Sequence, residues 1–266
     1  MTKITSLKET QKILTNLLAE FDKLCQKYDL KYSIVFGTLL GAIRHQGFIP
    51  WDNDIDVAMP REDYEKLLSL KYNDGRYEVK SYRYSKKYHY IFSKFSDNNT
   101  FIEEPENDGQ DLGLWIDIFP FDYIDTNYYE KNLETIDKKM KTYPKLYSKF
   151  GPNINKKNSE LEFKKVLAKY AHKIVLPFAN NILSIFEKHI ISLKGDMCVL
   201  YFHNFSGIKT SFLKSEWNNL TRVKFENIEV TAFKNYDKIL KNQFGDYMTL
   251  PPKDERVSHQ LKAYYR

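Results

Sequence analysis

The sequence predicts an α+β fold: a mixed β-sheet core flanked by helices, followed by a mainly helical C-terminal part. Up to about residue 125, short strand-like segments alternate with helical ones, and several strands follow one another directly, which indicates antiparallel as well as parallel pairing. Beyond that point the pattern changes to Lys-rich segments with helical periodicity. The 266 residues are 42% hydrophobic and 29% charged, a balance typical of a globular protein.

Apolar spacing and punctuating residues define each element of the first half. Residues 6–28 carry an apolar stripe at helical spacing, and Ser6 with Glu9 three residues later forms a capping-box pattern. A short apolar strand at 32–36 ends at Gly37, and a helix follows at 38–45. The remaining elements expected here are a strand at 55–59, a helix from Pro60, and strands at 77–82, 88–95, 100–103 and 114–119, the last stopped by Pro120.

The second half, residues 126–266, is expected to form a helical part with one small hairpin. The hairpin turns at Glu226-Asn227, and a helix at 236–244 ends at Gly245. The other helices are expected at 128–143, 161–175 and 178–193.

Charge and cysteine content narrow the function classes. A net charge of +6 and a pI near 8.9 suit nucleotides, phosphorylated acceptors or an anionic membrane surface, but do not indicate nucleic acid. Cys25 and Cys198 form no CxxC pattern, so we expect neither a zinc site nor a disulfide framework. The N-terminus lacks an apolar signal segment, and no run of about 18 apolar residues occurs. We therefore expect a cytoplasmic protein.

Three aspartates form the strongest chemical pattern. Asp54 and Asp56 are two residues apart in the expected strand at 55–59 and its approach, so their side chains should share one face. Neighbouring carboxylates raise each other's cost of ionisation, and a bound cation removes that cost. Asp117 stands in an apolar strand, where an unpaired carboxylate is expensive. A shared Mg²⁺, or Mn²⁺ as the alternative, would satisfy all three. Solvated acids on a surface strand, or for Asp117 a bond to backbone amides or an Arg, are the structural alternatives.

Gly37 and Thr38 form a second element just before the acids. A glycine lets the backbone approach a phosphate, and a helix N-terminus offers unpaired N–H groups and partial positive charge. The alternative is an ordinary strand-to-helix turn in which Thr38 caps the helix.

Together these motifs resemble the nucleotidyltransferase superfamily, where a Gly-rich turn precedes an acidic pair and a third acid comes from another strand. More narrowly, three blocks are similar to those of the LicD/fukutin family: FGTLLGAIRHQGFIPWDNDIDV at 36–57, WIDIFP at 115–120, and FGDYM at 244–248 with Pro251-Pro252. Asn53 departs from the Asp of many members, and the cysteine cluster of some eukaryotic relatives is absent.

The resemblance implies transfer of a phospho-alcohol, most often phosphocholine from CDP-choline, to a hydroxyl of a cell-surface glycan such as a teichoic-acid precursor, capsule or lipopolysaccharide. Relatives elsewhere use CDP-ribitol or related donors. By this resemblance Asp54, Asp56 and Asp117 hold Mg²⁺ against the donor diphosphate, Gly37 and Thr38 cradle it, and CMP leaves. Asp117 is our choice for the base that takes the hydroxyl proton. Residues 1–125 would be the nucleotidyltransferase-like catalytic core, and residues 126–266 would complete the active site and the acceptor side.

An anionic transition state needs nearby cations. Arg44, on the helix after Thr38, and Lys94, on the strand at 88–95, are the main candidates, with Arg256 as a weaker one; a solvated surface charge is the alternative for each. Three aromatic side chains could either bind a quaternary ammonium or simply pack in the core: Trp51, Trp115 and Tyr247.

Other hypotheses stay open. The apolar stripe at 178–193 and the lysines between 156 and 188 would suit peripheral contact with the inner face of a membrane that carries a lipid-linked acceptor, or an ordinary helix packed on the core. A nucleotidyltransferase that moves NMP from an NTP to a sugar or small molecule is the second functional hypothesis. A non-catalytic nucleotide- or glycan-binding protein is the third, and the complete acidic set argues against it.

Overall fold

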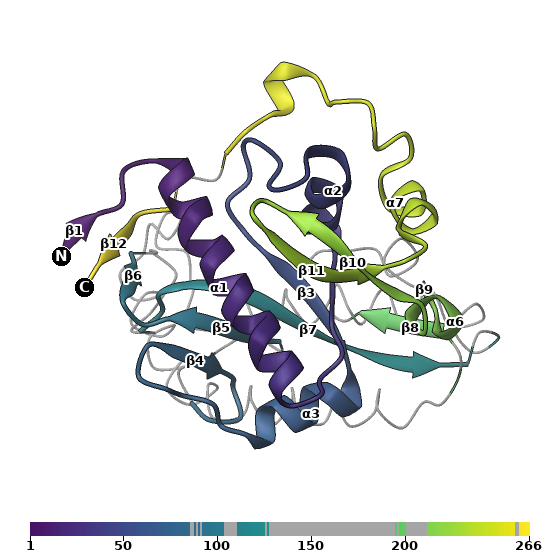
Figure 1. The fold of residues 1–266 in the computed structure, drawn as a ribbon, viewed down its shortest axis with the longest axis horizontal. Helices are drawn as coiled ribbons and strands as arrows, with labels where there is room; N and C mark the ends of the chain where they lie inside the picture. Colours follow the sequence, from purple (N-terminus) through teal and green to yellow (C-terminus); the bar gives the residue numbers. More distant parts are fainter. Residues whose placement is uncertain are drawn as a thin grey trace, which may run out of the picture.

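The sheet is organised around β7 (Leu114–Ile124), an 11-residue strand near its centre (Figure 1). In the computed structural model, β7 pairs in parallel with β3 (Asp56–Pro60) and antiparallel with β5 (Ser93–Asp97). Farther along, β8 (Met197–Leu200) takes the place of β5 as its antiparallel neighbour. The outer strands are β2 (Ser33–Ile34) beside β3, β4 (Tyr77–Lys80) beside β5, and β9 (Phe212–Leu213) beside β8. This mixed sheet with flanking helices confirms the predicted α+β class.

The structure describes residues 1–85, 88, 90, 92–103, 111–125, 127, 195, 197–200, 212–258 and 261–266. The helices expected at 128–143, 161–175 and 178–193 lie outside these residues, and so does the lysine-rich segment at 156–188. Within the described part of the chain, no helix combines the length and apolarity needed to cross a bilayer.

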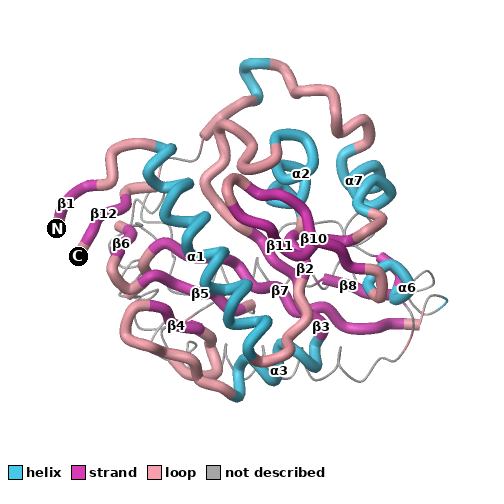
Figure 2. Tube along the Cα trace, viewed as in Figure 1, coloured by secondary structure: helices cyan, strands magenta, loops and turns pink. Residues whose placement is uncertain are grey.

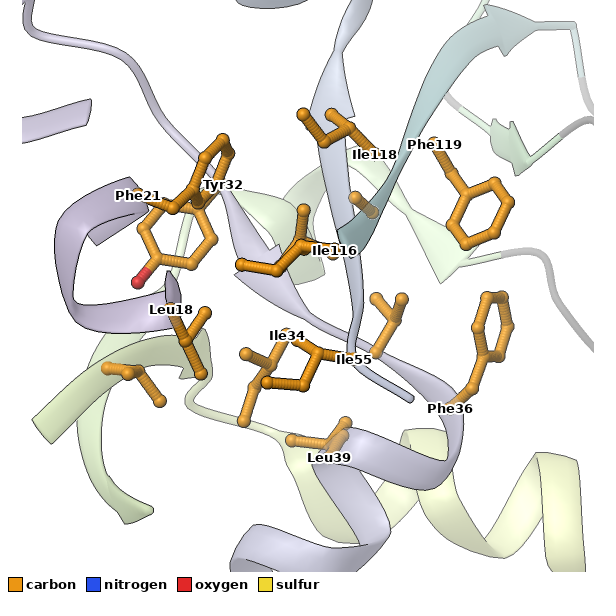
Figure 3. Packing of buried hydrophobic residues seen from close by; sticks show 14 of the residues in the cluster. Leu18, Phe21, Tyr32, Ile34, Phe36, Leu39, Ile55, Ile116, Ile118 and Phe119 are labelled. Atoms are coloured by element: carbon orange, nitrogen blue, oxygen red, sulfur yellow. The ribbon is translucent and has the colours of Figure 1, made fainter. Parts of the chain in front are cut away.

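Helix α1 (Leu7–Lys27) covers one face of the sheet. The Ser6 hydroxyl accepts a hydrogen bond from the Glu9 backbone N–H at 3.2 Å, which confirms the predicted N-cap. The apolar stripe packs on β5 and β7, where the Phe21 ring lies 5.5 Å from the Phe95 ring. Figure 3 shows this packing and, apart from it, the rings of Phe36 and Phe119 lying together. One sheet face is therefore closed by α1, and alternate residues of β5 and β7 point to the other face.

Helix α2 (Phe36–His45) begins two residues earlier than predicted, so the strand expected at 32–36 is shortened to β2. Phe36 has a φ of 51°, a backbone conformation that costs energy for a bulky residue. Its buried ring packs edge-on against Phe119 with the centroids 6.0 Å apart, which offsets part of that cost. The strand expected from residue 88 likewise begins only at Ser93.

The prediction that Pro120 stops its strand was wrong, because β7 continues to Ile124. Ile118 is the last residue that β5 pairs with, and Phe121 is the first that pairs with β8. Pro120 lies between them, where neither of these described strands needs its missing N–H. The proline therefore marks the change of neighbour along one edge of β7.

The described C-terminal segments return to the core. The predicted hairpin forms from β10 (Leu220–Phe225) and β11 (Ile228–Phe233), and it contacts α1 and α2, between which Figure 2 shows it. Helix α7 (Tyr236–Phe244) ends at Gly245, whose φ is 69°, as predicted. The remaining elements are α3 (Arg61–Ser69), α6 (Lys214–Trp217) and a small sheet of β1 (Thr2–Lys3), β12 (Ala263–Tyr265) and β6 (Thr100–Ile102).

Polar contacts at two places attach this hairpin. The Arg222 guanidinium donates to both carboxylate oxygens of Asp22 on α1, at 2.6 and 2.8 Å, and the Tyr32 hydroxyl donates to the same carboxylate at 2.5 Å. At the turn, the Glu226 carboxylate accepts from the Phe48 N–H at 3.0 Å, while the Glu226 N–H donates to the Gln46 carbonyl at 2.7 Å. The hairpin thereby fixes the loop that leads from α2 to the acidic segment.

Candidate active site

A row of three charged side chains crosses the sheet on the face opposite α1. Asp56 on β3 is directly beside Asp117 on β7 in the parallel register, and Lys94 on β5 is directly opposite Asp117 in the antiparallel register. Adjacent strands lie about 4.8 Å apart, so the hydrogen-bonded sheet itself fixes the spacing of these groups. The structure therefore brings together two of the three predicted acids and one of the predicted cations.

The acids are short of positive charge. Burial raises the pKa of the Asp56 carboxyl well above its usual value, and the negative charges of Asp54, Asp117 and Asp52 raise it further. Burial also raises the pKa of Asp117, although the Lys94 ammonium acts in the opposite direction. A further cation beside these carboxylates would favour their ionised form.

Lys94 supplies one such cation from within the chain. Its Nζ lies 2.5 Å from Oδ1 of Asp117, and the Lys94 side chain is only 2% exposed while that of Asp117 is 17% exposed. The sequence suggested an arginine as one possible partner of Asp117, and the structure shows a lysine instead. Because removing one partner of a buried ion pair strands the other charge, each side chain holds the other in place.

Asp54 lies outside the strand in which the sequence placed it. Strand β3 begins at Asp56, so Asp54 belongs to the preceding loop, where it is exposed while Ile55 is fully buried. Exposure still alternates from Asp54 through Ile55 to Asp56, so the predicted shared face of the two acids stays a prediction. The charge of Asp54 nevertheless raises the pKa of both Asp56 and Asp117, which puts it beside the row.

The predicted phosphate cradle, Gly37 and Thr38, lies within the first turn of α2. The Thr38 hydroxyl does not cap the helix; it accepts a hydrogen bond from the Asp56 N–H at 2.9 Å. A Cβ built on Gly37 would stand 3.0 Å from Oδ2 of Asp52, so this carboxylate lies over the glycine. Thr38 therefore positions Asp56, and a carboxylate stands where the sequence suggests a phosphate.

Arg44 lies near the end of α2, and Trp51 lies in the loop that follows this helix. An Nη1 of Arg44 donates to the Tyr247 carbonyl at 2.7 Å, which ties the end of α2 to the segment after α7. The Arg256 guanidinium lies over the Trp51 ring, 5.5 Å from its centre. Burial lowers the pKa of Arg44, and the charge of Arg256 lowers it further. The Tyr247 hydroxyl donates to Asp237, and Trp115 faces Lys94. Each of the three rings considered for binding a quaternary ammonium therefore has another partner in the structure.

The donor set suits a hard divalent cation. Carboxylate oxygens are the ligands that Mg²⁺ and Mn²⁺ prefer, and the raised pKa of Asp56 indicates a deficit of positive charge at this point. As the side chains stand, no group of three or more His, Cys, Asp or Glu residues in the described part of the chain is arranged to hold a metal ion. Asp117 would have to turn from Lys94 to join Asp56 and Asp54.

Sequence reasoning missed three residues of this site. Asp52 was given no role, yet its charge reaches Asp56. The rings of Tyr90 and Phe92 lie close to the Lys94 ammonium, at 4.4 and 5.2 Å. The available signal was the spacing of residues 90, 92 and 94, which is the alternation of one strand face.

Comparisons with known proteins agree with this arrangement. Residues 29–150 match the model of the LicD/FKTN/FKRP nucleotidyltransferase domain. The chain is 28% identical over 269 aligned residues to the lipopolysaccharide cholinephosphotransferase LicD of Haemophilus influenzae, covering 100% of this chain and 99% of that protein. It is also 30% identical to an uncharacterized protein of Rickettsia prowazekii, over 64% of this chain and 62% of that protein. A Rickettsia typhi protein is 29% identical, over 64% of this chain and 52% of its own length.

A mixed sheet that carries acids on adjacent strands, beside a helix that begins just after a short strand, lies in the part of the chain that matches a nucleotidyltransferase domain. Residues 29–150 match the domain of the LicD/FKTN/FKRP family, and the resemblance predicted from the motifs is confirmed.

Proposed function

We propose that this LicD-like phosphotransferase moves phosphocholine from CDP-choline to a hydroxyl of a cell-surface glycan and releases CMP. The observation that carries the proposal is the row Asp56–Asp117–Lys94, two acids and a cation on adjacent strands of a LicD/FKTN/FKRP domain. The full-length similarity to a protein named as a lipopolysaccharide cholinephosphotransferase supports the choice of alcohol and of acceptor class. A teichoic-acid precursor is the alternative acceptor, and CDP-ribitol or a related compound the alternative donor.

Asp56, Asp117 and Asp54 would hold Mg²⁺, with Mn²⁺ as the alternative. When bound, the ion would neutralise the donor diphosphate and stabilise the charge that develops on the departing CMP. Thr38 contributes by fixing the backbone of Asp56, and the ion would offset the negative charges that surround Asp56.

The chain's own groups provide the remaining chemistry. The acceptor oxygen forms a bond to the phosphorus that bears choline, and the bond from that phosphorus to the oxygen of CMP breaks. The hydroxyl proton passes to an Asp117 oxygen, on a carboxyl whose pKa is raised by burial, and then to water. Lys94 and Arg44 would hold phosphate oxygens during the transfer, and Gly37 would let the donor approach the first turn of α2.

Phosphorus NMR with CDP-choline, Mg²⁺ and a glycan acceptor tests the proposal. We expect CMP as the nucleotide product, intact NTPs, and loss of turnover in Asp54→Asn and Asp56→Asn. Pyrophosphate from an NTP would instead establish a nucleotidyltransferase, and binding without turnover of any donor would establish a binding protein.

Peripheral association with the inner face of the membrane is a separate part of the proposal. It rests on the lysines between 156 and 188 and on the lipid-linked acceptors that a glycan pathway would offer. Flotation with anionic liposomes at low salt should carry the protein upward. Absence of binding under these conditions would refute membrane contact and leave the transfer reaction untouched.

A further inference from the structure

Three aromatic rings surround the Lys94 ammonium. Its Nζ lies 3.9 Å from the centre of the Trp115 ring, 4.4 Å from that of Tyr90 and 5.2 Å from that of Phe92. The fourth neighbour is the Asp117 carboxylate at 2.5 Å. A space shaped for one cation is therefore already built beside the acid that the proposed reaction uses.

The sheet register produces this cage. Trp115 and Asp117 are two residues apart on β7, so both side chains point to the face opposite α1. Lys94 faces Asp117 across the antiparallel pair, and Phe92 precedes Lys94 by two residues. Trp115 and Tyr90 are only half-buried, so the cage borders the surface on the side of these two rings.

The chemistry of the cage suits a quaternary ammonium better than a primary one. A lysine ammonium is a strongly hydrated point charge with three N–H donors, and ring faces accept such donors only weakly. A trimethylammonium group has no N–H to satisfy, and its charge is spread over methyl groups that pack on ring faces. Aromatic cages are accordingly the usual sites for choline and methylated lysine.

We propose that the rings of Trp115, Tyr90 and Phe92 form the subsite for the quaternary ammonium of the donor, and that Lys94 fills this subsite when no donor is bound. The inference rests on the proposed function, since it requires a choline-bearing donor. Asp117 would be one ligand of a bound metal ion, which would weaken its hold on Lys94. The flexible Lys94 side chain then moves to the donor diphosphate, and the trimethylammonium group takes its place between the rings.

The first test compares two donors in a Trp115→Leu variant. CDP-ethanolamine has the same phosphate and nucleotide as CDP-choline but ends in a primary ammonium. We expect the wild type to prefer CDP-choline in kcat/KM, and Trp115→Leu to reduce that preference about tenfold, the usual scale for one strong cation–π contact. Tyr77→Leu is the matched control, because Tyr77 is another half-buried ring of the sheet beside a cation, Arg76 at 4.8 Å; this variant should keep the preference.

This assay separates the two hypotheses. If the wild type turns over neither donor, the proposed function fails. If the wild type prefers CDP-choline and Trp115→Leu keeps that preference in full, the cage is not the choline subsite while the function stands.

The second test needs neither metal nor turnover. Lys94→Ala should open the cage, so choline alone should raise its Tm more than it raises that of the wild type. The neutral analogue 3,3-dimethylbutan-1-ol, which has the same shape, should have no such effect, and the double variant Lys94→Ala/Trp115→Leu should lose the response. Equal responses to the two compounds, or no response of folded Lys94→Ala, would overturn the proposal. If Lys94→Ala does not fold, the comparison of the two donors in Trp115→Leu still tests the proposal, because that variant keeps Lys94.

Discussion

Replacing Thr38 with valine tests whether the start of α2 positions Asp56. Thr38 is 3% exposed, and its hydroxyl accepts the hydrogen bond from the Asp56 N–H at 2.9 Å. Valine keeps the size and shape of the side chain but leaves this backbone N–H without its partner. An unsatisfied buried donor costs about 1–3 kcal/mol. For a chain of this length each kcal/mol corresponds to about 2–4 °C, so the Tm should fall by about 2–12 °C.

Thr15→Val provides the matched control. Thr15 is 4% exposed, and its hydroxyl donates to the Gln11 carbonyl at 2.8 Å, so valine there leaves no donor unsatisfied. Scanning calorimetry of the two variants should show the larger loss at Thr38. CMP release should also slow in Thr38→Val alone, because a displaced carboxylate lowers the rate. Equal Tm values for the two variants would refute the positioning role of Thr38.

Three further perturbations have defined outcomes. Gly41→Ala should lower the free energy of unfolding in urea by about 1–3 kcal/mol, because the new Cβ would lie 2.4 Å from the Gly47 carbonyl oxygen. Gly37→Ala should cost less, because the nearest atom to its new Cβ is a side-chain oxygen at 3.0 Å. A larger loss for Gly37→Ala than for Gly41→Ala would contradict this packing. Asp56→Asn should raise the Tm of the metal-free protein at neutral pH while abolishing CMP release, because it removes a buried carboxylate that its neighbours repel; a lower Tm would argue against that repulsion. Burial and the charge of Arg44 lower the pKa of His45, so the folded state favours the neutral ring. The stability that His45 contributes is fully present above its unfolded pKa of about 6.5, and it is lost as the pH falls through the pKa of the folded state. His45→Gln should therefore flatten the pH dependence of unfolding free energy below about pH 6.5, and an unchanged slope would exclude His45 as its source.

Local patterns in the sequence predicted local structure well. The Ser6 cap, the hairpin at Glu226-Asn227 and the helix end at Gly245 each depend on a few adjacent residues, and all three are confirmed. The start of α2 at Phe36 was missed because a phenylalanine with positive φ is stabilised by its packing on Phe119, a residue far along the chain. Strand β12 was missed for a similar reason, since its partners are β1 and β6.

The candidate site also combines features that the sequence predicts with features that depend on distant contacts. Asp56 and Asp117 could be selected from the sequence because acids in apolar strands require an explanation. Their adjacency, and the pairing of Asp117 with Lys94, depend on the order and register of three strands that no local pattern specifies. The position of Asp52 over Gly37 depends on how the loop after α2 folds back along that helix. The metal set and the cradle remain predictions.

The register of β7 also has a consequence for how the chain reaches its native state. A shift of one residue would turn Asp117 into the apolar layer under α1 and present Ile116 or Ile118 on the reactive face. A shift of two residues along β5 would bring Pro120 opposite Ser93, where a ladder hydrogen bond would be lost. Misaligned sheets would thus be both unstable and inactive. The same side chains that form the charged row therefore also disfavour incorrect strand pairings.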